Sequence, residues 1–263
     1  MNSALQAQRA AKRVAHIKSH LDYESGRDLA IRNIENNLGD PRACLMGLSS
    51  RATASAMYEW FAHRDLVSTR QWFYVASRLT QKYYPMLDDT LGPGGRMLQL
   101  IEPLLSNNKP MIEWFAHYDR VYDLKRVENH KTHDFHAYQA VVALRGEWDR
   151  LAERCERVIR DPPGAATQQK YLLDHRFYLA LVHRDIAKMT EVIQTLVTPR
   201  MLKSRINDDS GYMADLISAA AVIYAKIAWY HGFEVHPTSP YIPEEWLPTT
   251  PLARYDDHYN FLE

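Results

Sequence analysis

The feature that most constrains the fold is the run from Gly211 to His231, whose interior is almost entirely apolar. Its polar interruptions are Asp215, Ser218 and Lys226. A soluble helix that is apolar around most of its circumference is normally buried by other helices. Roughly twenty such residues also suffice to cross a bilayer, but the two charged residues argue against a membrane span. We therefore expect a buried central helix over residues 211–231, with the rest of the chain packed around it.

A proline-punctuated segment, residues 234–248, follows this helix. Pro237, Pro240 and Pro243 each fix the φ angle and lack an amide hydrogen. We expect these prolines to hold the segment extended, so that it folds back over the central helix.

The remaining sequence favours an all-α fold. Runs of β-branched residues are scarce, and no Asn-Gly or Asp-Gly hairpin signal occurs. Ser68 is expected to cap the fourth helix, and the glycine-rich run Gly92–Arg96 is interpreted as a linker between helices. The helices expected before residue 130 cover residues 3–21, 24–37, 42–64, 69–84, 96–105 and 110–125.

Two segments in the second half share one layout. Residues 135–159 and 171–197 each contain an apolar helix, a short break and an amphipathic helix, and Asp161–Gly164 separates them. Short breaks produce antiparallel helix pairs. The sequence therefore predicts irregular stacked helical hairpins, similar to a bundle or solenoid, around the buried C-terminal helix. We expect one all-helical domain over residues 1–263, with helical parts 1–130 and 131–248 and a tail at 249–263.

Composition excludes several classes of protein. Basic and acidic residues number 32 each, so the chain carries no net charge that would attract nucleic acid in bulk. Its two cysteines cannot form a disulfide framework, which favours a reducing compartment. The N-terminus lacks the apolar core of a signal peptide. We expect a cytoplasmic protein with neither a nucleic-acid nor a membrane partner.

No motif in the sequence indicates catalysis. Cys-x-x-Cys, Gly-x-Ser-x-Gly and His-Glu-x-x-His are all missing from it. A repeated Glu-Trp-Phe-Ala-His segment places Glu59 with His63 and Glu113 with His117, a spacing that puts each pair on one helix face and suggests a reused face or a metal site. The cluster of His130, His133 and His136 is interpreted as the start of a helix. We expect no catalytic residue, cofactor or metal.

The C-terminal third resembles the immunity protein 49 family of bacterial polymorphic toxin systems. The likeness is good over residues 165–248 and loose before them, although Asp185 and Trp72 have comparable helical contexts. Residues 249–263 look like an addition. The matching residues are Gly211, Tyr212, Ala219, Ala220, Ala221, Gly232, Val235, Ser239, Pro240, Tyr241, Ile242, Pro243 and Leu247.

The resemblance implies a non-catalytic protein that binds and neutralises a cognate toxin encoded nearby, in the cytoplasm of the producing cell. The toxins of the family vary, so the resemblance names no target, and a nuclease-type cytoplasmic effector is expected on base rate alone. Two alternatives stay open: a helical-repeat adaptor with another protein partner, and an α-helical metalloenzyme that uses the two Glu-His pairs.

The end of the chain is the predicted toxin-binding region. Residues 244–263 carry a charge of about −4 with interleaved aromatic residues, which suits a basic nuclease cleft. The alternative is that Tyr241 and Trp246 simply close over the central helix. Exchange of Asp256 and Asp257 for Lys is expected to weaken binding without changing thermal stability. The candidate toxin-binding residues are Glu244, Glu245, Trp246, Arg254, Tyr255, Asp256, Asp257 and Tyr259.

Overall fold

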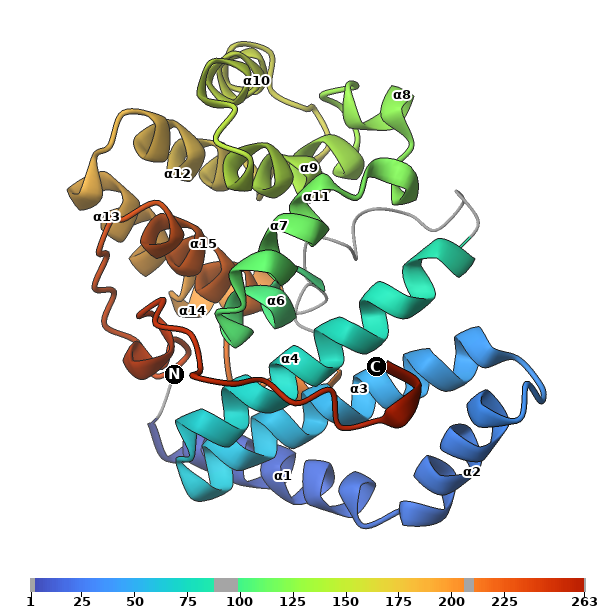
Figure 1. The fold of residues 1–263 in the computed structure, drawn as a ribbon. Coiled ribbons are helices and arrows are strands. Elements are labelled where there is room, and N and C mark those ends of the chain that lie inside the picture. Colours follow the sequence, from blue (N-terminus) through green and yellow to red (C-terminus); the bar gives the residue numbers. More distant parts are fainter. Residues whose placement is uncertain (1–2, 88–98, 206–210, 263) are drawn as a thin grey trace. The chain divides into compact units, whose positions relative to one another are not determined.

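The structure is a computed structural model that describes residues 3–87, 99–205 and 211–262 (Figure 1). Within these ranges every regular element is a helix and no strand occurs, which confirms the all-α prediction. The chain divides into two compact units, which are described separately. Unit 1 contains Met1–Asp88, Glu102–Ile112 and Thr250–Glu263, and unit 2 contains Asp89–Ile101 and Glu113–Thr249. The division does not fall at residue 130, and the tail belongs with the N-terminal helices.

Four helices form the body of unit 1: α1 (Ser3–Leu21), α2 (Glu24–Glu35), α3 (Pro41–Tyr58) and α4 (Leu66–Tyr83). Helix α3 begins with Pro41 at a position where no amide donor is needed, and the Asp40 carboxylate accepts from the next two amides. A π-helical turn, Glu59–His63, extends α3 and ends at Arg64, which has a left-handed φ of 58°.

Asp65, not Ser68, caps helix α4. The Asp65 carboxylate accepts from the Ser68 amide at 3.0 Å and from the Ser68 hydroxyl at 2.7 Å. The prediction of Ser68 as the cap is wrong because an Asp three residues earlier can reach the same amide, so the helix starts at Leu66.

Unit 1 buries a carboxyl group between α3 and α4. Glu102, from α6 (Ile101–Ser106), accepts from the Thr53 hydroxyl at 2.5 Å and from the Thr80 hydroxyl at 3.3 Å. Burial raises the pKa of Glu102 to about 7, although both hydrogen bonds act in the opposite direction. The predicted linker Gly92–Arg96 lies outside the described residues.

Two helical hairpins form much of unit 2, as predicted. Helix α9 (His133–Leu144) pairs with α10 (Trp148–Arg160), and α12 (Leu172–Val182) pairs with α13 (Ile186–Leu196). Gly146 and Arg184 have left-handed φ angles of 68° and 57° where the first helix of each pair ends. This is the usual conformation just after a helix C-terminus.

The single helix predicted over residues 110–125 is wrong. Helix α7 (Lys109–His117) ends early, a 3₁₀ turn covers Asp119–Val121, and α8 (Leu124–Val127) follows. The Asp123 carboxylate caps α8 by accepting from the Lys125 and Arg126 amides. Asp side chains compete with helical hydrogen bonds in this way, and they start a new helix instead of continuing the old one. The short helices α11 (Ala166–Gln169) and α14 (Pro199–Ser204) also belong to unit 2.

The central helix of unit 2 is α15 (Ala219–Tyr230), and every residue from Ala219 to Ala228 is buried. It packs against α9 and α13. The sequence correctly predicts that this helix is buried. The helix is shorter than the predicted range of 211–231. Gly211–Met213 is a separate 3₁₀ turn, and Asp215 has a left-handed φ of 66°, which an α-helix does not accommodate.

Candidate functional site

The proline-containing segment after α15 folds back over this helix, as expected. The Tyr241 carbonyl accepts from the Ser218 amide just before α15 at 3.0 Å. The Trp229 indole donates to the Val235 carbonyl at 3.0 Å. Hydrogen bonds in both directions also join the Gln194 side chain of α13 to the backbone of Thr238. The segment therefore supplies backbone partners to the helices that it covers.

Lys226 is the strongest anchor of this segment. Its side chain is 1% exposed, and its ammonium donates to the carbonyls of Trp246, Leu247 and Pro248 at 3.1, 3.0 and 3.4 Å. These carbonyls end the short 3₁₀ helix Glu244–Trp246. A cation at a helix C-terminus satisfies the last carbonyls and opposes the negative end of the helix dipole. The polar residue that interrupts the apolar helix is thus the one that holds the following segment.

The structure separates the predicted residues of this segment by exposure. Glu244 and Glu245 are exposed, whereas Trp246 is 2% exposed and lies in the core of unit 2. Tyr241 is buried as well. The positions of these two residues agree with the alternative drawn from the sequence, in which Tyr241 and Trp246 close over the central helix.

The tail, residues 250–262, lies along α4 in unit 1. The Tyr255 hydroxyl donates to the Ser106 carbonyl at 2.7 Å, and its ring packs on Tyr74 with centroids 4.7 Å apart. The Gln71 side chain makes hydrogen bonds to both the amide and the carbonyl of Asp256. Tyr259 is buried at 8% exposure. The tail is therefore a packed part of unit 1.

Asp257 makes the strongest attachment of the tail. Its carboxylate accepts from Arg78 Nε and from the Tyr74 hydroxyl, both at 2.8 Å, and from Arg78 Nη2 at 3.2 Å. Partial burial raises the pKa of Asp257, but the hydrogen bonds from Arg78 and Tyr74 outweigh this effect and hold the pKa below its ordinary value. Exchange of Asp257 removes these contacts. We therefore expect it to lower thermal stability, in contrast to the expectation from the sequence.

The exposed members of the predicted set are divided between the two units. Glu244 and Glu245 belong to unit 2, and Arg254 and Asp256 belong to unit 1. Four of the eight predicted residues thus present side chains to solvent, and the other four are buried or partly buried: Trp246, Tyr255, Asp257 and Tyr259.

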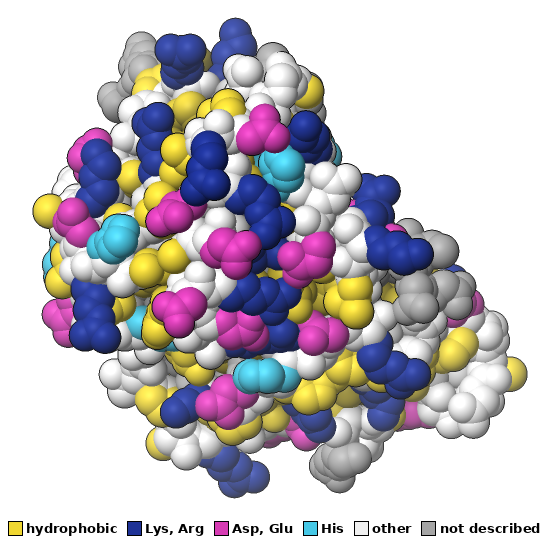
Figure 2. Space-filling model, turned by 90° about the horizontal axis from the view of Figure 1, so that it is seen from above, with side chains coloured by type: hydrophobic (Ala, Val, Ile, Leu, Met, Phe, Trp, Pro, Cys, Tyr) yellow, Lys and Arg dark blue, Asp and Glu magenta, His cyan; other side chains and the backbone are white. Residues whose placement is uncertain are grey.

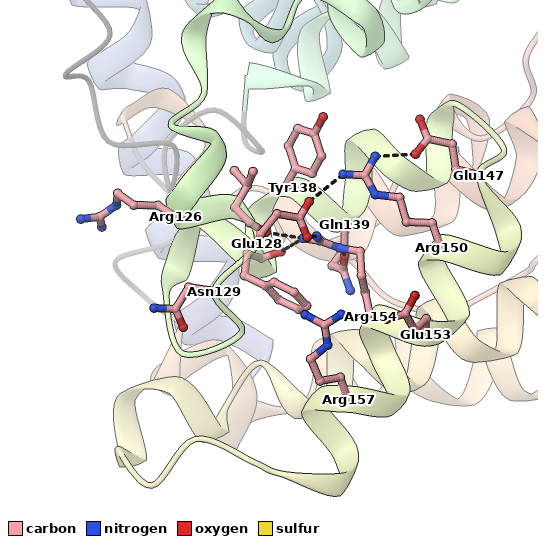
Figure 3. A network of polar contacts seen from close by, with 12 residues as sticks. Arg126, Glu128, Asn129, Tyr138, Gln139, Glu147, Arg150, Glu153, Arg154 and Arg157 are labelled. Carbon is pink, nitrogen blue, oxygen red and sulfur yellow. Dashed lines mark hydrogen bonds and ion pairs between the residues drawn. The ribbon is translucent and has the colours of Figure 1, made fainter.

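A buried polar network in unit 2 was not predicted from the sequence (Figure 3). Arg154 of α10 is 1% exposed, and its guanidinium donates to Glu128 at 2.7 Å, to the Gln139 side-chain oxygen at 2.6 Å and to the Val127 carbonyl at 2.7 Å. It also lies 3.9 Å from the centroid of the Phe135 ring. Glu128 binds Arg150 in addition, at 2.7 Å. This network ties α10 to α9 and to the loop after α8.

The network continues to two buried histidines. Gln139 donates from its amide nitrogen towards Cys155 and His175, and His175 Nε2 lies 2.7 Å from His136 Nδ1. Burial lowers the pKa of His136 to about 4 and that of His175 well below its ordinary value, so both are neutral at pH 7. Burial also raises the pKa of the Cys155 thiol. A neutral, enclosed set of this kind positions helices, and it does not present a nucleophile.

The cluster of His130, His133 and His136 lies at the start of a helix, as interpreted from the sequence, and its members have different partners. His130 pairs with Asp161 at 3.0 Å, His133 is exposed beside Tyr171, and His136 faces His175 in the core. Only His133 and His136 are on α9, so the spacing of three aligns two imidazoles and not three.

The repeated Glu-Trp-Phe-Ala-His segments differ in backbone conformation. The first forms the π-helical turn Glu59–His63, and the second is an α-helical turn at the end of α7. The expectation of one reused face is wrong, because Trp60 and Phe115 are buried whereas Phe61 and Trp114 are partly exposed. Within the described parts of the chain, no three His, Cys, Asp or Glu residues are grouped so that they could hold a metal ion.

A comparison with models of known protein families identifies the family of this chain. The family model of immunity protein 49 matches residues 113–246, which is half of the chain. The chain belongs to this family. The match begins about fifty residues before the resemblance seen in the sequence, and it takes in both hairpins, α15, Lys226 and the segment up to Trp246. Helices α1–α4 and the tail lie outside it.

Neither a curated protein nor a solved structure matches the chain. None of the helices in the described ranges combines the length and the apolar character that crossing a bilayer requires.

Proposed function

We propose that this immunity protein binds and neutralises a cognate antibacterial effector toxin in the cytoplasm of the cell that produces both, and that it does so without catalysis. The observation that carries this proposal is the family match over residues 113–246. Burial lowers the pKa of His136 and raises that of the Cys155 thiol, which suits a packing role for this network inside unit 2.

We further propose that Glu244 and Glu245 contact the toxin. They are exposed on a short helix whose backbone is fixed by Lys226, so little conformational entropy is lost on binding. Paired carboxylates on a rigid turn suit a toxin with a basic active-site cleft, such as a nuclease. On the face shown in Figure 2, basic and acidic side chains alternate, so complementarity there depends on individual ion pairs. Arg254 and Asp256 are the corresponding exposed candidates in unit 1.

Co-expression with the toxin encoded beside this gene tests the proposal. Wild-type protein is expected to restore growth when the toxin is induced and to co-purify with a catalytically inactive toxin. Continued growth arrest, with the protein present in soluble form, would refute the function.

The contact residues are tested by charge reversal. Glu244→Lys with Glu245→Lys is expected to weaken toxin binding at least tenfold with an unchanged melting temperature. Glu153→Lys is the matched control, because Glu153 and Glu244 are similarly exposed, at 71% and 76%, and both lie in unit 2. Equal affinity of both variants would place Glu244 and Glu245 outside the interface.

A further inference from the structure

A pocket of about 380 Å³ lies in unit 1 between α2 and α3, beside the C-terminal end of α1. This volume falls within the range of ligand-binding sites. Leu29, Ala30, Ala43 and Leu48 provide apolar walls. Helix α2 has no buried residue, and Tyr23 and Leu29 at the pocket are 65% and 52% exposed. Unit 1 therefore presents an open apolar groove along one side of α2.

A glycine inside α3 keeps this groove open. Gly47 is helical and lines the pocket, and a Cβ added there would meet nothing within 4 Å among the described residues. Gly inside a helix costs about 1 kcal/mol relative to Ala. Neither a close backbone approach nor a left-handed φ explains it. A larger residue would be more stable in the helix but would fill the groove.

The groove is electrostatically one-sided. Its lining includes two arginines, Arg27 and Arg51, and no acidic residue. Arg27 is paired with Asp28 at 2.9 Å and with Glu24 at 3.6 Å. The Arg51 guanidinium donates to the carbonyls of His20, Leu21 and Tyr23, and among the described contacts it has no carboxylate partner.

The adjoining helix α1 extends this positive character. Helix α1 contains no Asp or Glu, and Arg9 and Lys12 are exposed on it. Positions 9, 13 and 20 fall on one side of a helix, so Arg9 and Arg13 lie on the side of α1 that leads to His20 at the pocket. An occupant of the groove must therefore combine apolar and acidic groups.

We propose that this α2–α3 groove receives an acidic amphipathic helix of the toxin. Large apolar side chains of that helix enter the pocket over Gly47, and its acidic side chains face α1 and Arg51. Two neighbouring helices that present an apolar groove bind a third helix in this way in many recognition complexes. The inference rests on the proposed function, and it adds a second contact surface, outside the family match, to the one at Glu244 and Glu245.

Filling the groove tests the inference without disrupting the fold. Gly47→Leu is expected to raise or preserve the melting temperature and to weaken binding of the catalytically inactive toxin at least tenfold by calorimetry. Leu29→Glu should weaken binding similarly. Val67→Glu is its matched control, because Val67 is 65% exposed in the same unit but does not line the pocket.

The two cysteines supply an independent readout of occupancy. Cys44 lines the pocket and is partly exposed, whereas Cys155 is buried with a raised pKa, so a thiol reagent such as Ellman's reagent reports on Cys44. Bound toxin is expected to slow Cys44 labelling at least tenfold.

The outcomes separate the two proposals. A complex in which Cys44 labels at the free rate, and to which Gly47→Leu binds normally, overturns the groove inference and leaves the proposed function standing. A wild-type protein that binds no toxin refutes both. Protection of Cys44 before toxin is added, through dimerisation seen by light scattering or a co-purified fatty acid seen by mass spectrometry, assigns the groove to another occupant and refutes the inference.

Discussion

Replacement of Asp257 by Ala is expected to destabilise unit 1 by loosening the tail from α4. The change removes three hydrogen bonds, two from Arg78 and one from Tyr74, at a site where the ion-paired side chains are 26% and 24% exposed. A hydrogen bond to a charged group contributes about 1.5–3 kcal/mol when buried, and an exposed ion pair contributes below about 1 kcal/mol. For this intermediate exposure, we expect a loss of about 2 kcal/mol.

Thermal and urea unfolding measure this loss, with Asp256→Ala as the control. Asp256 is exposed and its side chain accepts only from the nearby His258 amide among the described contacts, so its removal should cost about 0.5 kcal/mol. For a chain of this size, 2 kcal/mol corresponds to a fall of about 4–8 °C in melting temperature. Melting temperatures of the two variants that agree within about 1 °C would refute the argument.

The loss should also depend on pH. The folded-state pKa of Asp257 is lowered, so the unfolded chain binds this proton more readily than the folded chain. The stabilisation by Asp257 is therefore fully present above the unfolded pKa of about 4 and is lost as the pH falls through the folded pKa. The wild type and Asp257→Ala should differ at pH 7 and converge in acid. A difference that stays constant down to pH 2 would exclude the ion pair as its source.

Two further variants test buried groups. Lys226→Met leaves the carbonyls of residues 246–248 without their buried donor and should cost about 2–4 kcal/mol in urea unfolding, whereas unchanged stability would show that these carbonyls have other partners. Glu102 has a folded pKa raised to about 7, so its contribution is fully present below its unfolded pKa and is lost as the pH rises through 7. Glu102→Gln should abolish a decline of about 3 kcal/mol in wild-type stability between pH 4.5 and 8, and an equal decline in both proteins would contradict the assignment.

Most helices and the burial of α15 could be predicted from the sequence, because the pattern of apolar residues along a helix is a local property of the chain. It contained less information about their ends. The hydrophobic pattern predicts too early a start for α15, because the left-handed conformation of Asp215 leaves no periodic signal. Asp65 and Asp123 each capped a helix where periodicity alone suggested another boundary.

Contacts between distant segments were largely beyond prediction. The aromatic residues at 241–261 suit an exposed interface and a core equally well, and only the structure shows that Trp246 packs in unit 2 while Tyr255 packs on Tyr74 in unit 1. Arg154 did leave a signal, because it shares an apolar helix face with Leu151, Cys155 and Val158. A charged residue at such a position predicts a buried partner, but the partner itself cannot be read from spacing.

The packing of residues 250–262 on α4 has a consequence for biosynthesis. Helices α1–α4 leave the ribosome long before the residues that cover α4 are made. At typical translation rates of about 5–20 residues per second, the interval is roughly 10–30 seconds. Most of unit 2 is synthesised within that time, while Tyr74 and Arg78 still lack their partners. Unit 1 is therefore completed only after residues 250–262 have been made, although synthesis of that unit begins first.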